Sequence, residues 1–113
     1  MKIVDRKTFL AMPPETLFCK YEPCIFGDIA IKGDSIFFES GDDFFCQHLG
    51  DAIDCNGCGE MLETLERARL FGDSFRMDFE CQGRDGCFDE KELFMVFEKA
   101  DIAALIERLQ RCA

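Results

Sequence analysis

The sequence predicts one α+β domain over residues 1–113, with a mostly antiparallel sheet of four to six strands and two or three helices packed on one face. Three observations lead to this prediction. The chain has 113 residues, a length typical of one hydrophobic core. Apolar residues make up 48% of it and 13 residues are Phe, which is enough apolar material to offset the entropy lost on folding. Strand patterns dominate the first half, and no alternating series of strands and helices indicates a parallel sheet.

The first half begins with a brief helix and continues with strands. Asp5 can cap a helix that ends at about Met12, because the two prolines after it cannot donate backbone hydrogen bonds. Farther along, Gly33 and Asp34 form a strong hairpin signal between two apolar runs. The strands expected in this half are residues 16–21, 28–32, 35–39 and 44–48.

The second half contains two helices with strands between them. Helical spacing of apolar residues begins after Gly59 and stops at Gly72. Residues 75–81 alternate apolar and charged side chains, which predicts a strand with one buried face. Residues 93–97 are apolar throughout, which predicts a strand that is covered on both faces or lies at the sheet centre. Asp101 is the expected cap of the last helix. The apolar stripes of the two helices are Met61, Leu62, Leu65 and Ala68 in the first and Ile102, Leu105, Ile106 and Leu109 in the second.

The charge and the absence of targeting signals limit the classes of partner. No apolar run reaches the roughly 20 residues of a membrane helix, and the first residues lack a secretion signal, so we expect a cytoplasmic protein without membrane contact. The formal charge of −10 disfavours direct binding of DNA or RNA and favours a basic protein surface, such as that of a nucleic-acid-binding complex. The alternative is that the charge only keeps a Phe-rich domain soluble. The carboxylates expected to bind a partner are Asp42, Asp43, Asp51, Asp54, Glu60, Glu63 and Glu66.

Two cysteines form half of a metal-binding pattern. Cys55 and Cys58 are separated by two residues that include a glycine, which resembles the knuckle of zinc-ribbon proteins. A structural zinc ion needs two more ligands, and Cys46 and His48 lie just upstream. The alternative is a loop with two ordinary thiols or a redox pair. The sequence predicts no cofactor, with zinc as the alternative.

A second pattern resembles the latter part of an EF-hand calcium loop. Gly86 stands at the sharp turn and Glu92 at the place of the bidentate ligand. The two earlier ligand positions fall on Cys81 and Gly83, which offer no carboxylate. The alternative interpretation is a glycine-containing turn between two strands.

Turn residues offer a third kind of site. Lys20, Tyr21 and Arg84 could together hold an anionic small ligand, the alternative being ordinary solvated turns. His48 is the only histidine, and no sequence motif supplies it with a nucleophile and an orienting group, so the sequence predicts no enzyme.

Three segments of the N-terminal third combine helix-stop, turn and hairpin residues. They are Phe9-Leu10-Ala11-Met12-Pro13-Pro14-Glu15-Thr16, Lys20-Tyr21-Glu22-Pro23 and Ile31-Lys32-Gly33. Together they resemble the opening of small uncharacterised proteins of phages and prophages. This resemblance implies a setting in which small non-enzymatic proteins block host defence, either at basic nucleic-acid sites or by sequestering a signalling nucleotide.

Three functions follow in order of preference. The first is an inhibitor of a host defence complex, of the anti-CRISPR kind, that acts through its acidic surface. The second is a sponge for a signalling nucleotide that binds through Lys20, Tyr21 and Arg84 at a subunit interface of a homo-oligomer. The third is an interaction module stabilised by zinc.

Overall fold

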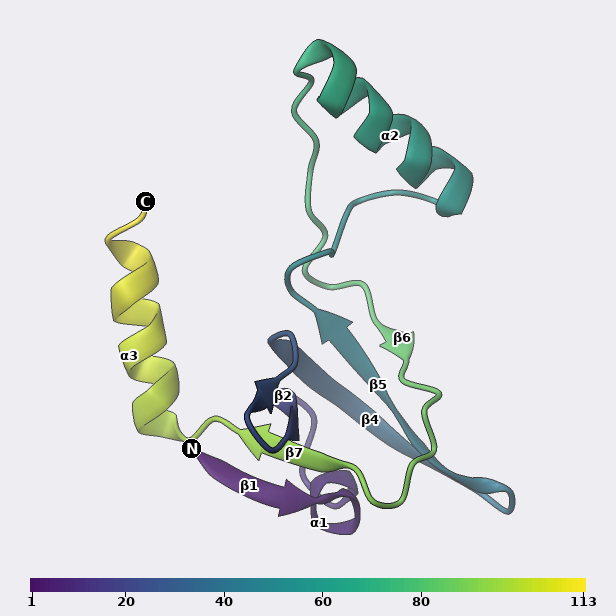
Figure 1. Cartoon of the computed structure of the whole chain (residues 1–113), viewed down its shortest axis with the longest axis vertical. Helices are drawn as coiled ribbons and strands as arrows, with labels where there is room; N and C mark the ends of the chain where they lie inside the picture. The colour runs from purple at the N-terminus through teal and green to yellow at the C-terminus, as the bar shows by residue number, and fades with distance from the viewer.

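A computed structural model describes residues 1–113 and confirms the α+β class, with an antiparallel seven-stranded sheet and three helices (Figure 1). The strands lie in the order β1-β7-β2-β4-β5-β6, and β3 pairs with β2. The strands are β1 (Lys2–Asp5), β2 (Thr16–Glu22), β3 (Ile25–Phe26), β4 (Ala30–Phe38), β5 (Gly41–His48), β6 (Gly83–Arg84) and β7 (Leu93–Val96). The helices are α1 (Arg6–Leu10), α2 (Cys58–Phe71) and α3 (Lys99–Gln110).

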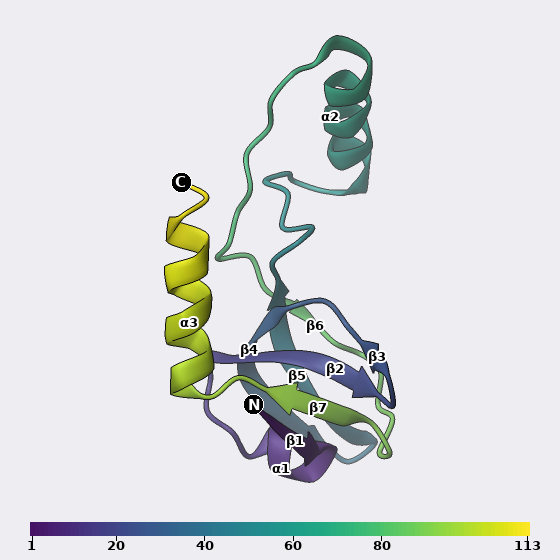
Figure 2. The ribbon, with the colours of Figure 1, turned by 60° about the vertical axis from the view of Figure 1, so that its left-hand side comes forward.

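Four phenylalanines form the centre of the core. Phe9 of α1 stacks on Phe94 of β7 with ring centroids 3.9 Å apart, and Phe18 and Phe44 pack around this pair at 4.7 and 5.1 Å from Phe9. All four side chains are buried. In Figure 2, β7 and β2 lie in front of β4 and β5, so the curved sheet brings these rings together. Asp5 caps α1 as predicted, because its carboxylate accepts a hydrogen bond from the Thr8 N–H at 2.8 Å.

Strand β7, from the last quarter of the sequence, pairs with β1, which begins at residue 2. It lies between β1 and β2, with Val4 opposite Phe94 and Phe18 opposite Val96. The prediction of an interior strand here is confirmed. Strand β1 is not among the predicted strands, because its four residues carry little pattern of their own and their pairing partner is remote in the sequence. With β1, β3 and β6 included, the sheet exceeds the expected four to six strands.

The hairpin predicted at Gly33 and Asp34 is wrong. Strand β4 continues through these residues with a shift of register between Lys32 and Ser35. The buried Lys32 ammonium donates to the Gly33 carbonyl at 3.0 Å and to the Ser35 hydroxyl at 2.9 Å, which holds the bulge. The chain turns instead before Gly41, whose φ of 141° suits glycine.

Helices α2 and α3 form where predicted but do not pack on the sheet. Neither has a buried residue, so the expectation that the helices cover one face holds only for α1. Both lie above the sheet in the two views (Figures 1 and 2), although β5 and β7, the strands that precede them, run antiparallel to each other. Gly72 ends α2 in the left-handed conformation, with φ of 72°. Glu98, and not Asp101, is the N-cap of α3, and Asp101 completes a capping box from the third helical position.

The strand predicted over residues 75–81 is also wrong. Only Met77 makes a bridge, with Ile53, while Phe75 and Phe79 are exposed. The alternating pattern is present, but no second strand lies beside this segment to complete a ladder. None of the helices has the length and apolar character needed to cross a lipid bilayer.

Candidate functional site

Residues 51–80, called the arm below, leave the sheet after β5 and return to it at β6. Its two legs are joined near the sheet by the bridge between Ile53 and Met77 and by two backbone hydrogen bonds. The Asp54 N–H donates to the Arg76 carbonyl at 2.9 Å, and the Asp78 N–H donates to the Ala52 carbonyl at 2.6 Å. Helix α2 is the outer part of the arm, away from the phenylalanine core (Figure 1). The arm is therefore anchored at its base and presents α2 to solvent.

The arm carries half of the protein's net charge. It has eight carboxylates against three arginines, a formal charge of −5 out of −10. The carboxylates predicted to bind a partner are exposed here, and four of them make no ion pair within the chain. The fifth, Glu66, lies 4.0 Å from the exposed Arg69 guanidinium. The unpaired four are Asp51, Asp54, Glu60 and Glu63.

The remaining two predicted carboxylates are not part of this acidic surface. Asp43 is fully buried, so its selection as a partner-binding residue is wrong. Its position in an acidic turn hid this burial, because the face of β5 opposite to the core residues Phe44 and Cys46 is covered at Asp43 by the chain after β6. Asp42 is exposed, but it belongs to the β4–β5 hairpin, which points away from α2 in Figures 1 and 2. The acidic surface therefore lies on the arm alone.

Asp43 instead accepts hydrogen bonds from residues at and after the end of β6. Its carboxylate accepts hydrogen bonds from the Arg84 Nε at 2.9 Å, the Gly86 N–H at 3.0 Å and its neighbour's Phe44 N–H at 2.8 Å. Burial alone would raise the pKa of Asp43, but these hydrogen bonds favour the ionised form and together hold the pKa below its usual range. The carboxylate thus stabilises the native state while it is charged.

This geometry predicts a specific acid dependence. Asp43→Asn should lower the free energy of unfolding by about 2 kcal/mol at pH 7, because charge-assisted hydrogen bonds are lost. Since the folded pKa lies below the unfolded value of 3.8, the contribution of Asp43 is full above pH 3.8 and disappears as pH falls through the folded pKa. Urea unfolding of both proteins between pH 7 and pH 2 measures the difference. A difference that stays constant down to pH 2 would contradict this role.

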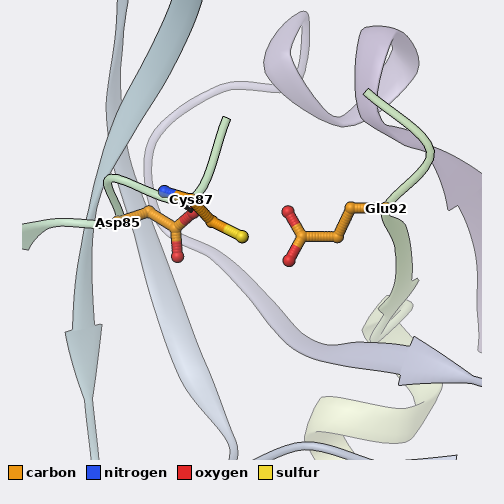
Figure 3. A group of neighbouring side chains, drawn as sticks. All are labelled: Asp85, Cys87 and Glu92. Atoms are coloured by element: carbon orange, nitrogen blue, oxygen red, sulfur yellow. Dashed lines mark hydrogen bonds between the residues drawn. The ribbon is translucent and has the colours of Figure 1, made fainter. Parts of the chain in front are cut away.

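Asp85, Cys87 and Glu92 form the one group of three acidic or thiol side chains whose ligand atoms lie within 4.8 Å of one another. Figure 3 shows the three side chains pointing toward a common space between the β6–β7 loop and the start of β7. The Lys20 ammonium reaches this group, at 2.6 Å from Asp85 Oδ1 and 2.8 Å from Glu92 Oε1. A cation of the protein itself therefore neutralises the two carboxylates that a calcium ion would need.

The charges around Glu92 form a continuous network. The second carboxylate oxygen of Glu92 accepts a hydrogen bond from the buried Arg6 guanidinium at 3.0 Å, and Arg6 also donates to the Asp42 carbonyl at 2.7 Å. Burial would lower the pKa of Lys20, but its hydrogen bonds to Asp85 and Glu92 outweigh burial and raise the pKa. The residues that resemble a calcium loop thus form a turn between β6 and β7, held by lysine and arginine.

The four predicted zinc ligands do not come together as one group. Cys46 and His48 are neighbours on β5, with Sγ and Nε2 3.7 Å apart. Cys55 lies in the leg of the arm that leads from β5 to α2, and Cys58 is the exposed first residue of α2. Burial, with a smaller contribution from the charge of Asp85, raises the pKa of the Cys46 thiol to about 11. At neutral pH this thiol is protonated, so it is a poor nucleophile for His48 to activate.

The predicted anion site is also divided. Lys20 and Tyr21 line a groove of about 420 Å³, whereas Arg84 lines a separate pocket of about 270 Å³ beside Cys46 and His48. Lys20 is paired with two carboxylates and Arg84 with Asp43. Neither cation is available to an anionic ligand without breaking an ion pair.

Sequence reasoning missed the contact between Arg6 and Glu92, which are 86 residues apart. No local pattern connects them, because the pairing of β1 with β7 brings them together. Comparison with protein-family models, curated proteins and solved structures found no match to this chain.

Proposed function

We propose that the protein is a non-enzymatic binding protein whose acidic arm docks onto a basic surface of a partner complex. The observation that carries this proposal is the set of four exposed carboxylates without intramolecular ion pairs, Asp51, Asp54, Glu60 and Glu63, on one projecting segment. Unpaired charges on a projecting segment can approach a partner closely, and they lose no internal ion pair on binding.

A surface of this kind fits a groove that binds nucleic acid. Such grooves are lined by lysine and arginine at positions that match phosphates, and carboxylates spaced along a helix can occupy the same positions. The N-terminal resemblance to phage proteins makes a host defence complex that handles nucleic acid the first partner to test. Under this proposal the protein inhibits that complex by excluding its nucleic acid.

Charge reversal on α2 tests the proposal. Glu60→Lys, Glu63→Lys and Glu66→Lys together should weaken binding of the partner at least about tenfold, because like charges then face each other. A matched control reverses three exposed carboxylates outside the arm, Glu22→Lys, Glu39→Lys and Glu90→Lys, which changes the net charge equally. The measurement is the affinity for the partner complex isolated with the wild-type protein, at several salt concentrations and with short duplex DNA as competitor.

Three results support the proposal when they occur together: loss of binding in the arm variant, retention in the control, and competition by DNA. Equal binding by the arm variant and the wild type would refute it. Binding that is independent of salt would also refute it, because exposed charge pairs are screened by salt.

A further inference from the structure

Helices α2 and α3 expose apolar stripes that the rest of the chain does not cover. Leu62 is 66% exposed on α2, and Ile106 and Leu109 are 51% and 57% exposed on α3. The helices contain 14 and 12 residues. Helices of this length are marginally stable in water unless an apolar face is buried. Both helices therefore need a covering surface wherever the protein is folded.

The exposed surface area of the chain indicates how large the missing covering surface is. The chain exposes 8191 Å². A compact monomer of 12.9 kDa exposes about 6,300 Å² by the usual scaling with mass. The excess is about 1,900 Å², and the radius of gyration of 16.1 Å likewise exceeds the roughly 13 Å of a compact chain of this length.

This excess matches one side of a permanent interface. A standard protein interface buries about 800 Å² on each partner, and permanent homodimers bury about 1,000–2,500 Å² on each. The excess of about 1,900 Å² lies within the range for permanent homodimers. Because α2 and α3 need this interface in order to form, its occupant must be present wherever the chain is made. A second copy of the chain meets this condition.

We propose that a second copy of this chain covers the apolar faces of α2 and α3 in a twofold-symmetric dimer. Both helices lie above the sheet in the views of Figures 1 and 2, so one rotation axis on that side can bring four helices together. The dimer leaves the acidic surface free, since Glu63 lies about 160° around the axis of α2 from Leu65. This inference is independent of the partner-binding function proposed above.

The test compares substitutions on the helices with substitutions on the sheet. Leu65→Glu with Ile106→Glu places charges in both stripes, at side chains that are exposed in the single chain. The control, Phe26→Glu with Phe37→Glu, changes two side chains that are 62% and 68% exposed on the sheet. Sedimentation equilibrium should give twice the chain mass of 12.9 kDa for the wild type and the control. The helix variant should dissociate, with a dimer dissociation constant raised about a hundredfold or more.

A second measurement does not depend on any variant. The midpoint of thermal unfolding of the wild type should rise with protein concentration, because dimerisation stabilises only the folded chain. A wild-type mass of one chain, with a midpoint independent of concentration, would overturn the proposal and leave a different protein as the occupant. A helix variant that remains folded and dimeric would overturn it as well. If circular dichroism shows that this variant is unfolded, the concentration dependence of the wild-type unfolding midpoint alone tests the dimer.

Discussion

Phe9→Ala should lower the free energy of unfolding by about 3–5 kcal/mol, the range for deleting a buried phenylalanine ring. Phe9 is fully buried and lies within 5.1 Å, centroid to centroid, of the rings of Phe18, Phe44 and Phe94. Removing it takes the central ring out of a four-ring cluster and leaves a cavity between α1 and the sheet. A domain of this size is stable by about 5–15 kcal/mol, so much of its stability would be lost.

Urea denaturation at one fixed protein concentration measures this loss. Phe37→Ala is the matched control, because Phe37 is exposed at the tip of the β4–β5 hairpin and should change stability by less than about 0.5 kcal/mol. A loss below about 1 kcal/mol for Phe9→Ala would contradict the central place of this ring, since rearrangement of the core would then have filled the space.

Glu92→Ala should destabilise the protein by a similar amount, about 3–5 kcal/mol, for an electrostatic reason. The side chain of Arg6 is 5% exposed and has Glu92 as its only carboxylate partner. Removing Glu92 leaves a buried guanidinium with one carbonyl acceptor, on Asp42, and leaves Lys20 with Asp85 alone. The cost is that of an uncompensated buried charge.

A double substitution separates this charge effect from packing. Arg6→Met with Glu92→Leu removes the ion pair and fills its volume with apolar atoms, so it should lose less stability than Glu92→Ala alone. The free energies of unfolding of both variants and the wild type, measured at pH 7, give the comparison. A double variant that is less stable than Glu92→Ala would show that Arg6 stabilises the protein through contacts other than its pair with Glu92.

Local signals sufficed for those parts of the fold that depend on few residues. The two prolines ended α1, Gly72 ended α2, and the apolar run at β7 indicated an interior strand. The hairpin predicted at Gly33 and Asp34 was wrong because the same residues suit either a turn or a bulge. The choice between them depended on where the Lys32 ammonium is buried, which is a tertiary property.

The candidate sites were predictable only in part, for a related reason. The sequence identified the carboxylates of the arm, because charged residues between glycines are usually exposed. It could not separate Asp43 from Asp42, since their difference is the direction of a side chain on β5. Nor could it show that Lys20 lies between Asp85 and Glu92, because three separate segments meet there.

The position of β7 between β1 and β2 determines when this protein can fold during its synthesis. Phe9, Phe18 and Phe44 leave the ribosome long before Phe94, which completes their cluster. At typical bacterial and eukaryotic translation rates of about 5–20 residues per second, the unfinished chain exposes these rings for seconds. The four-ring cluster therefore closes only after β7 has left the ribosome, and until then the three earlier rings lack their last packing partner.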